Sequence, residues 1–127
     1  MNYNSPHTVL NNQRYIIYDL MKEYTSTGSI VIDVGAQTGQ EARFLALHIG
    51  RSGHIYSFEP VPHLAQRIKD WMAGTTSIGM TQESLGNITL IEKAVHCTGG
   101  QKKTFYQDNN HVPSSSFVKE CVDAWKG

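Results

Sequence analysis

The chain has 127 residues, and its 11 basic and 11 acidic residues give a formal net charge of zero. This balance argues against a nucleic-acid-binding surface, which needs Lys and Arg clustered on one face. No apolar run approaches the roughly 20 residues that span a bilayer, and the first residues lack the layout of a signal peptide, so we expect one cytoplasmic domain over residues 1–127 with no membrane partner.

The first element expected is an amphipathic helix over residues 12–24. Its apolar side chains recur three and four residues apart, as one face of a helix requires. They are Ile16, Ile17, Leu20, Met21 and Tyr24. Ser and Gly residues then interrupt the pattern, so residues 1–27 are expected to form an N-terminal helical segment. The short, mainly apolar run Ile30–Val34 is typical of a buried strand.

Helices and strands alternate after this first strand. Residues 40–49 lack helix breakers and stop at Gly50, which predicts a helix with a glycine after its end. A second strand is expected over residues 54–58. Two prolines follow it and favour a helix from about His63. A third strand is expected over residues 87–95.

Two more segments complete the expected order. Residues 102–107 resemble a short additional strand, and residues 108–116 resemble a polar loop. The alternation predicts an α/β fold of the Rossmann-like, doubly wound type, in which right-handed crossovers join parallel strands. We place its core over residues 28–107.

The segment IVIDVGAQTG holds the candidate ligand site. Gly35 and Gly39 follow the first strand, and glycine permits both unusual backbone dihedrals and close approach of a ligand. The next helix points free N–H groups above this turn, which favours a carboxylate or a phosphate. Glu59 ends the second strand, where it can accept hydrogen bonds from both hydroxyls of a ribose. Sites for dinucleotides and for S-adenosylmethionine share these features.

Two details favour S-adenosylmethionine. The dinucleotide pattern GxGxxG, counted from Gly35, fails at Gln37 and at Gln40. Asp33 would repel a pyrophosphate but attract an ammonium group. Each feature also has a purely structural explanation, since Asp33 can cap a turn, the glycines can serve packing and Glu59 can be solvated. Their joint placement favours an S-adenosylmethionine site and leaves an NAD-dependent oxidoreductase as the weaker alternative.

Three segments together resemble the N-terminal half of the FkbM-type methyltransferases, a branch of the class I S-adenosylmethionine-dependent enzymes. They are VIDVGAQTG, IYSFEPVPHLAQRIKD and NITLIEKAV, the last followed by a glycine pair. The resemblance covers about residues 28–107, and the Phe-Glu-Pro after the second strand is its most specific element. It implies an O-methyltransferase whose acceptor is a hydroxyl group of a sugar or another small molecule.

The resemblance also implies roles for single residues. The methionyl end of the cofactor would lie against Asp33, Gly35, Ala36, Gln37 and Gly39. Family members usually have Asn in place of Gln37, so a side-chain amide is kept at the turn. Glu59 would bind the ribose and Pro60 would shape the adenine side. The end of the third strand, Glu92–Ala94, would lie near the adenine.

The chain departs from the family because it lacks the fourth strand and its acidic motif. A class I fold has seven strands, of which three or four can be placed here, so we expect a partial domain. The position of the fourth strand would then be an open sheet edge with an uncovered apolar face, which favours self-association. A non-catalytic cofactor-binding fragment or interaction module is therefore a second candidate function.

No residue is a convincing catalytic base. His96, His111 and Ser114–Ser116 follow the third strand and could reach an acceptor, but solvated residues of a polar loop look the same. The six histidines are scattered without a metal-ligand spacing. The sequence therefore predicts neither a catalytic base nor a metal centre.

Overall fold

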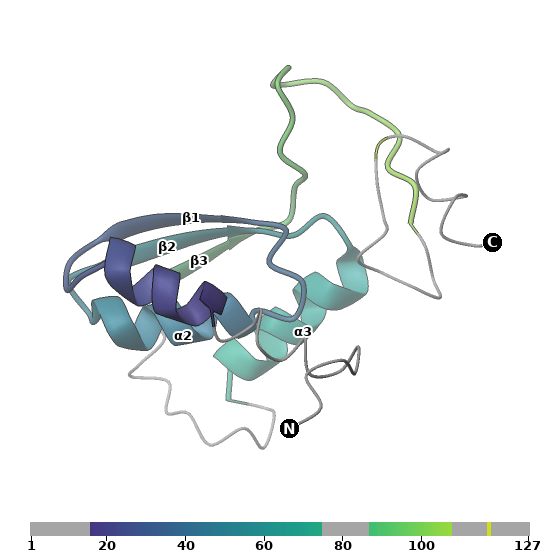
Figure 1. Cartoon of the computed structure of the whole chain (residues 1–127). Helices are drawn as coiled ribbons and strands as arrows, with labels where there is room; N and C mark the ends of the chain where they lie inside the picture. The colour runs from purple at the N-terminus through teal and green to yellow at the C-terminus, as the bar shows by residue number, and fades with distance from the viewer. Residues whose placement is uncertain (1–15, 75–86, 108–116, 118–127) are drawn as a thin grey trace, which may run out of the picture.

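The computed structural model describes residues 16–74, 87–107 and 117 of the chain. Its bounded elements are, in chain order, β1 (Ile30–Val34), α2 (Gln40–Ile49), β2 (His54–Phe58), α3 (Pro62–Met72) and β3 (Ile88–Ile91). The strands form one parallel sheet in the order β1-β2-β3, and α2 and α3 lie on the same face of it (Figure 1). This arrangement confirms the predicted Rossmann-like α/β fold.

Glycine and proline set the limits of these elements. Gly39 precedes α2 with a φ of 79°, and Gly50 follows it with a φ of 67°. Both values lie in the left-handed region that glycine favours. Pro62 stands at the start of α3, where its missing N–H leaves no helical bond unmade. The predicted bounds of β1, α2 and β2 are confirmed, and α3 starts just before the predicted His63.

The hydrophobic core lies between the sheet and the two helices. Ile55 of β2 and Ile68 of α3 are completely buried there. Asn87 closes one end of this layer, because its Nδ2 donates to the carbonyl oxygens of Ala46 (3.2 Å) and Gly50 (2.9 Å). These bonds satisfy two carbonyls at the end of α2 and fix the start of β3 to that helix.

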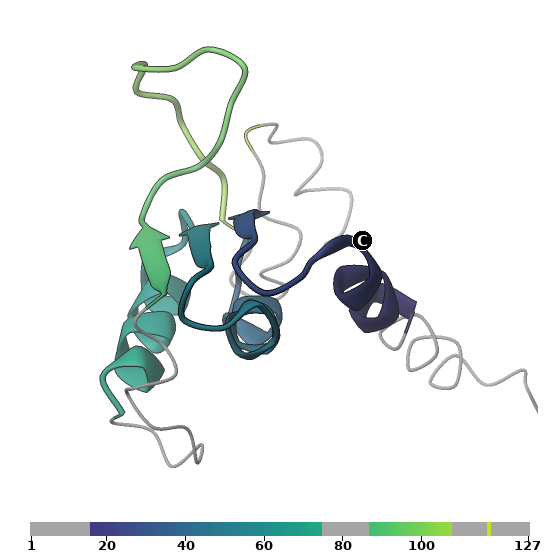
Figure 2. The ribbon, with the colours of Figure 1, turned by 90° about the vertical axis from the view of Figure 1, so that its left-hand side faces the viewer.

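The opposite face of the sheet is open within the described residues. Ile30, Ile32 and Val34 of β1 point to this face, and each side chain is at least 59% exposed. Figure 2 shows α2 and α3 beneath the sheet and the N-terminal helical residues 16–24 beyond the edge of β1. Among the described residues, these exposures agree with the predicted uncovered apolar face. A second helical layer, as in a doubly wound sheet, does not occur among the described residues.

This open face predicts self-association, because β1 is the edge strand of the described sheet and its exposed side chains are apolar. Sedimentation velocity should show dimers or larger species. Ile32→Lys should shift them toward monomer, since a charge on an edge strand opposes pairing. Leu47 of α2 is also well exposed (59%), so Leu47→Lys serves as the control. A monomer at every concentration, or equal effects of the two variants, would contradict the prediction.

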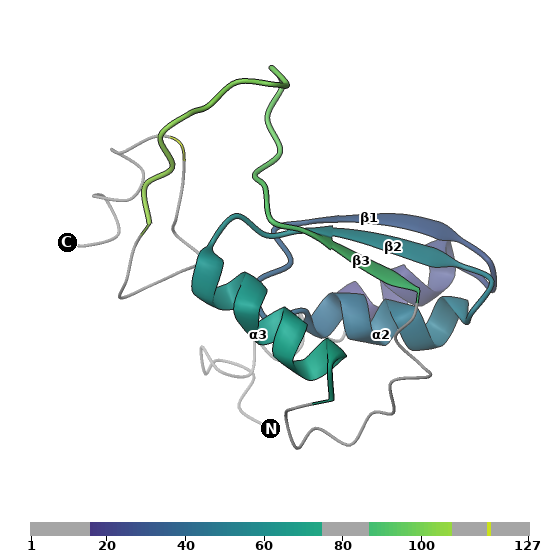
Figure 3. The same cartoon turned by 180° about the vertical axis from the view of Figure 1, so that it is seen from behind.

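The chain leaves the sheet earlier than predicted. β3 ends at Ile91 rather than at residue 95, because the N–H of Lys93 donates to the carbonyl oxygen of Ile91 (2.8 Å) in a tight turn. The chain then rises from the sheet and comes back down beside the first turn of α3 (Figures 1 and 3). There, Gln107 Nε2 lies 3.4 Å from His63 Nδ1. We call residues 92–107 the arch.

The additional strand predicted over residues 102–107 is wrong. Within that segment only Tyr106 forms an isolated bridge. Gly100, with a φ of 73°, turns the chain just before it, so the segment descends as one limb of the arch. The predictions for residues 12–15 and for the loop 108–116 lie outside the described residues. Among the helices of the described ranges, none has the length and apolar character needed to cross a membrane.

Candidate functional site

The glycine turn after β1 is folded onto the end of β2. The N–H groups of Gly35 and Ala36 both donate to the carbonyl oxygen of Phe58 (2.9 and 3.0 Å), and the N–H of Gly39 donates to Ala36 (2.7 Å). Gly35 has a φ of 80°, and Gln37 has a φ of 52°, which is unusual for a residue with a side chain. Ala36 is 2% exposed and packs in the core, so its backbone rather than its side chain faces the turn.

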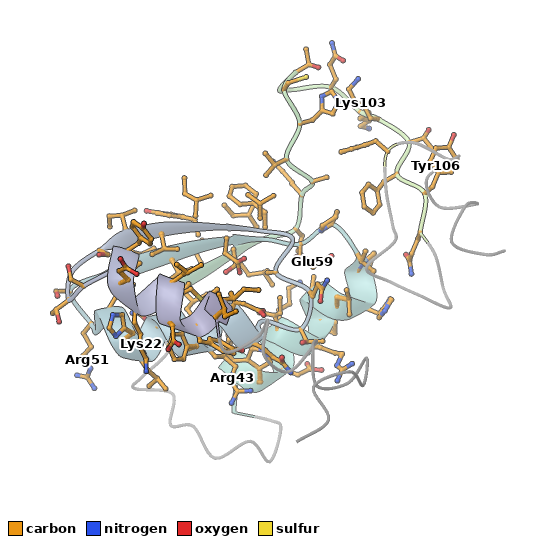
Figure 4. The ribbon with its side chains drawn as sticks, in the orientation of Figure 1. Lys22, Arg43, Arg51, Glu59, Lys103 and Tyr106 are labelled. Atoms are coloured by element: carbon orange, nitrogen blue, oxygen red, sulfur yellow. The ribbon has the colours of Figure 1, made fainter. Side chains whose placement is uncertain are left out.

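Glu59 holds this turn in place. Its Oε2 accepts from the N–H of Gln37 (2.7 Å), and its Oε1 accepts from the N–H of Val61 (2.8 Å). Figure 4 shows Glu59 between the turn and the start of α3. The side chain is 2% exposed, so these bonds offset the cost of burying a carboxylate. The structure thus gives Glu59 a structural role that the sequence analysis did not anticipate.

Trp71 of α3 supports the turn from below. Its Nε1 donates to the carbonyl oxygen of Thr38 (2.9 Å), and the Arg43 guanidinium lies 5.4 Å from its ring centroid. The ring also fills the space beside Gly39, where an added Cβ would stand 2.5 Å from Trp71 Cζ2. Gly39 is therefore required by packing as well as by its positive φ. Trp71 is not among the site residues predicted from the sequence.

Asp33 lies at the end of β1, directly across from Ser57 of β2. The completely buried Ser57 hydroxyl donates to Asp33 Oδ2 (3.2 Å). Burial raises the pKa of the Asp33 carboxyl, the bond from Ser57 lowers it, and the negative charges of Glu41 and Glu59 raise it further. The net pKa lies above the ordinary aspartate value. Three acidic side chains, Asp33, Glu41 and Glu59, therefore lie close enough together around the glycine turn for the charges of the last two to act on Asp33.

The raised pKa of Asp33 predicts how stability depends on pH. The folded state holds the proton more tightly than the unfolded state, so this contribution to stability is complete below the ordinary aspartate pKa and is lost as the pH rises through the raised value. Asp33→Asn removes the titration while keeping an acceptor for Ser57. Thermal unfolding should therefore show the variant more stable than the parent near about pH 7 and nearly equal near about pH 3. Glu23→Gln removes one exposed negative charge and serves as the matched control.

The residues predicted on the adenine side lie apart from the glycine turn, in a cavity. A cavity of about 830 Å³, which we call the arch cavity, lies at the carboxyl ends of β2 and β3 beneath the arch. Pro60 and Glu92–Ala94 line it, as predicted residues on the adenine side, and so does His96. Glu92 also forms an ion pair with Lys69 of α3 (2.6 Å). His111 and Ser114–Ser116 lie outside the described residues.

A hydrogen bond within the arch determines which ring nitrogen of His96 carries the proton in the neutral form. Nδ1 accepts a hydrogen bond from the N–H of Thr98 (3.1 Å). In the neutral imidazole the proton must then be on Nε2, which makes Nε2 a donor rather than a base. The described ranges contain no group of three or more His, Cys, Asp or Glu side chains that could hold a metal ion.

A smaller cavity of about 420 Å³ lies on the other side of the turn, between β1, α2 and the N-terminal helical residues. Asp33 and Glu41 line it together with apolar residues that include Leu20 and Leu45. The structure therefore brings Asp33, Gly35, Gln37, Gly39 and Glu59 together at the turn, with Asp33 facing one cavity and Pro60 facing the other.

Comparison with known proteins gives a likeness in fold. No protein-family model matches the sequence, and no curated protein matches it. The structure is similar to a proposed rRNA methylase from Clostridium thermocellum (TM-score 0.52, 19% identity, covering 62% of this chain and 39% of that chain). It is also similar to an rRNA methylase from Streptococcus thermophilus (TM-score 0.50, 18% identity, covering 63% and 38%).

A third solved structure is a SAM-dependent O-methyltransferase from Thermotoga maritima (TM-score 0.51, 17% identity, covering 65% of this chain and 28% of that chain). The chain thus spans between 28% and 39% of the length of these three proteins. At these identities the likeness concerns the fold alone, and membership of the FkbM-type family stays a prediction. The described elements share the α/β fold of a part of each of these three proteins.

Proposed function

We propose that this chain binds S-adenosylmethionine and forms the cofactor-binding part of a methyltransferase. The observation that carries the proposal is the charge around the glycine turn, where the negative charges of Glu41 and Glu59 act on Asp33. S-adenosylmethionine brings a sulfonium and an ammonium group, and a negative site attracts both. The likeness in fold to three methyltransferases supports the same function.

The same charge disfavours NAD. A pyrophosphate above the turn would face the carboxylates of Asp33 and Glu41. It would also find few donors, because the N–H groups of Gly35, Ala36, Gln37 and Gly39 all donate within the protein. The N–H groups that the first turn of α2 leaves free can receive a single carboxylate, such as that of a methionyl group.

The parts of the cofactor have distinct proposed partners. The ammonium group pairs with Asp33, and the methionyl chain lies along Gly35, Gln37 and Gly39. The ribose hydroxyls bind Glu59, whose oxygens each keep a lone pair beyond the backbone bond that they accept. Because that side chain is 2% exposed, the ribose reaches it only if the neighbouring chain moves aside. The adenine enters the arch cavity beside Pro60 and Ala94.

For the reaction we propose O-methylation of a small-molecule or sugar hydroxyl, on the strength of the resemblance to FkbM-type enzymes. When bound, the cofactor supplies an activated methyl group, and the residues of this chain orient it and exclude water. A non-catalytic cofactor-binding module is the alternative. A methyl-transfer assay with hydroxyl-bearing acceptors distinguishes the two, because the module would bind the cofactor with no turnover.

Calorimetry with S-adenosylmethionine, S-adenosylhomocysteine and NAD tests cofactor choice. We expect both S-adenosyl compounds to bind and NAD not to bind. Asp33→Ala should weaken the binding of S-adenosylmethionine by roughly 10- to 100-fold, the range for one charge-assisted hydrogen bond. Glu92→Ala is the control, since Glu92 is a half-exposed acid already paired with Lys69. Binding of NAD alone, or unchanged affinity in Asp33→Ala, would overturn the proposal.

A further inference from the structure

The arch cavity has a charge opposite to that of the glycine turn. Three lysines line it, Lys93, Lys102 and Lys103. The acidic residue in its described lining, Glu92, is neutralised by Lys69 at 2.6 Å. None of the three lysines forms an ion pair with another described residue. Ammonium groups gathered around a concave surface repel one another and focus a positive potential into it.

These lysines come from both limbs of the arch. Lys93 directly follows β3, whereas Lys102 and Lys103 follow the turn at Gly100. Figure 4 shows Lys103 high on the arch, at the opposite end of the molecule from Lys22 and Arg51. The balanced overall charge of the chain hides this local excess, which is why composition gave no sign of an anion site.

The cavity also has an aromatic wall. The ring centroids of Phe105 and Phe117 lie 5.2 Å apart, edge to face, and His96 makes the same contact with Phe117 at 5.2 Å. All three rings line the cavity. Such a wall can cover the flat or apolar body of a ligand, while the lysines hold its charged group.

We propose that the arch cavity binds a small molecule that carries a phosphate group. A phosphate monoester has a charge between about −1.5 and −2 near neutral pH and offers three acceptor oxygens, so it can engage several ammonium groups at once. A carboxylate carries one charge and would leave the lysine cluster largely uncompensated. The proposed adenine would enter the same cavity beside Pro60 and Ala94, so the two proposals share the cavity but use different residues of its lining.

Calorimetry on the full chain with matched pairs of ligands tests this proposal. Glucose 6-phosphate should bind and glucose should not, AMP should bind more tightly than adenosine, and glucuronate should bind more weakly than glucose 6-phosphate. Comparing glucose 6-phosphate with AMP separates a sugar phosphate from a nucleotide. The Lys102→Gln/Lys103→Gln double variant should weaken binding of the phosphate esters by roughly 10- to 100-fold, as expected for lost charge-assisted bonds. Binding should also weaken as the salt concentration rises.

Two controls separate this proposal from the cofactor proposal. Lys22→Gln removes a cation far from the arch and should leave phosphate binding unchanged. The double variant should bind S-adenosylhomocysteine like the parent chain, because the proposed adenine contacts are Pro60 and Ala94 rather than the two lysines. Asp33→Ala should bind the phosphate esters like the parent chain. Phosphate esters that bind no better than their uncharged partners, or equally well to the double variant, would overturn the proposal. So would binding of a single-stranded RNA by a chain that binds neither ester.

Discussion

Replacing Gly39 by alanine is expected to lower the free energy of unfolding by about 2–5 kcal/mol. A Cβ at this position would stand 2.5 Å from Trp71 Cζ2, and overpacking of this kind costs ~1–3 kcal/mol. The φ of 79° adds the cost of a left-handed residue that is not glycine, ~1–2 kcal/mol. Urea unfolding followed by circular dichroism measures the change.

Gly35→Ala is the matched control for this change. Gly35 has nearly the same φ, 80°, but an added Cβ there would meet no atom within 4 Å. Its substitution should therefore cost only the left-handed conformation, ~1–2 kcal/mol. The difference between the two variants isolates the contact with Trp71. Equal losses of stability would show that Trp71 does not pack against Gly39 in the way described.

Glu59→Gln is expected to destabilise the fold even though the two side chains have the same shape. The carboxylate accepts one backbone N–H on each oxygen, from Gln37 and from Val61. A glutamine has a single acceptor oxygen, so its NH₂ group would face one of these donors and leave it unsatisfied in a buried site. An unsatisfied buried donor costs ~1–3 kcal/mol, which urea unfolding can resolve.

Glu92→Gln provides the comparison for Glu59. Glu92 is half exposed and its ion pair with Lys69 is solvated, so its loss should cost no more than ~1 kcal/mol. Measuring S-adenosylhomocysteine affinity in both variants then separates two roles of Glu59. If Glu59 served only to accept hydrogen bonds from the ribose, Glu59→Gln would lower the affinity for S-adenosylhomocysteine and leave the free energy of unfolding unchanged.

The sheet and its helices could be predicted where local signals mark the boundaries. Gly50 and the Pro60–Pro62 segment interrupt apolar patterns, and the bounds of α2 and β2 agree with the prediction. The end of β3 has no glycine or proline to mark it, and Ala94 and Val95 resume the apolar pattern after Glu92 and Lys93. The strand ends where the Lys93 N–H donates to the Ile91 carbonyl oxygen in a tight turn, which the sequence alone does not predict.

The part of the candidate site that could be predicted is the part that continuous sequence or strand topology brings together. Asp33 and the glycines occupy one continuous turn, and Glu59 follows the neighbouring strand, so topology alone brings them together. Ser57 and Trp71 were missed because they act across 24 and 33 residues of chain. The contact of Ser57 with Asp33 depends on the register of β1 against β2, and the contact of Trp71 with the turn depends on the packing of α3 beneath it. Neither relation appears as a local sequence pattern.

The position of Trp71 makes the glycine turn visible by fluorescence. Its indole is 6% exposed, donates to Thr38 and lies beneath the Arg43 guanidinium, so its emission depends on the conformation of the turn. The chain has two tryptophans, and the other is Trp125. Trp125→Phe therefore yields a protein with a single tryptophan, which lies at the site. Titrating that protein with any candidate ligand reports on the turn directly, without a label and without knowledge of the reaction.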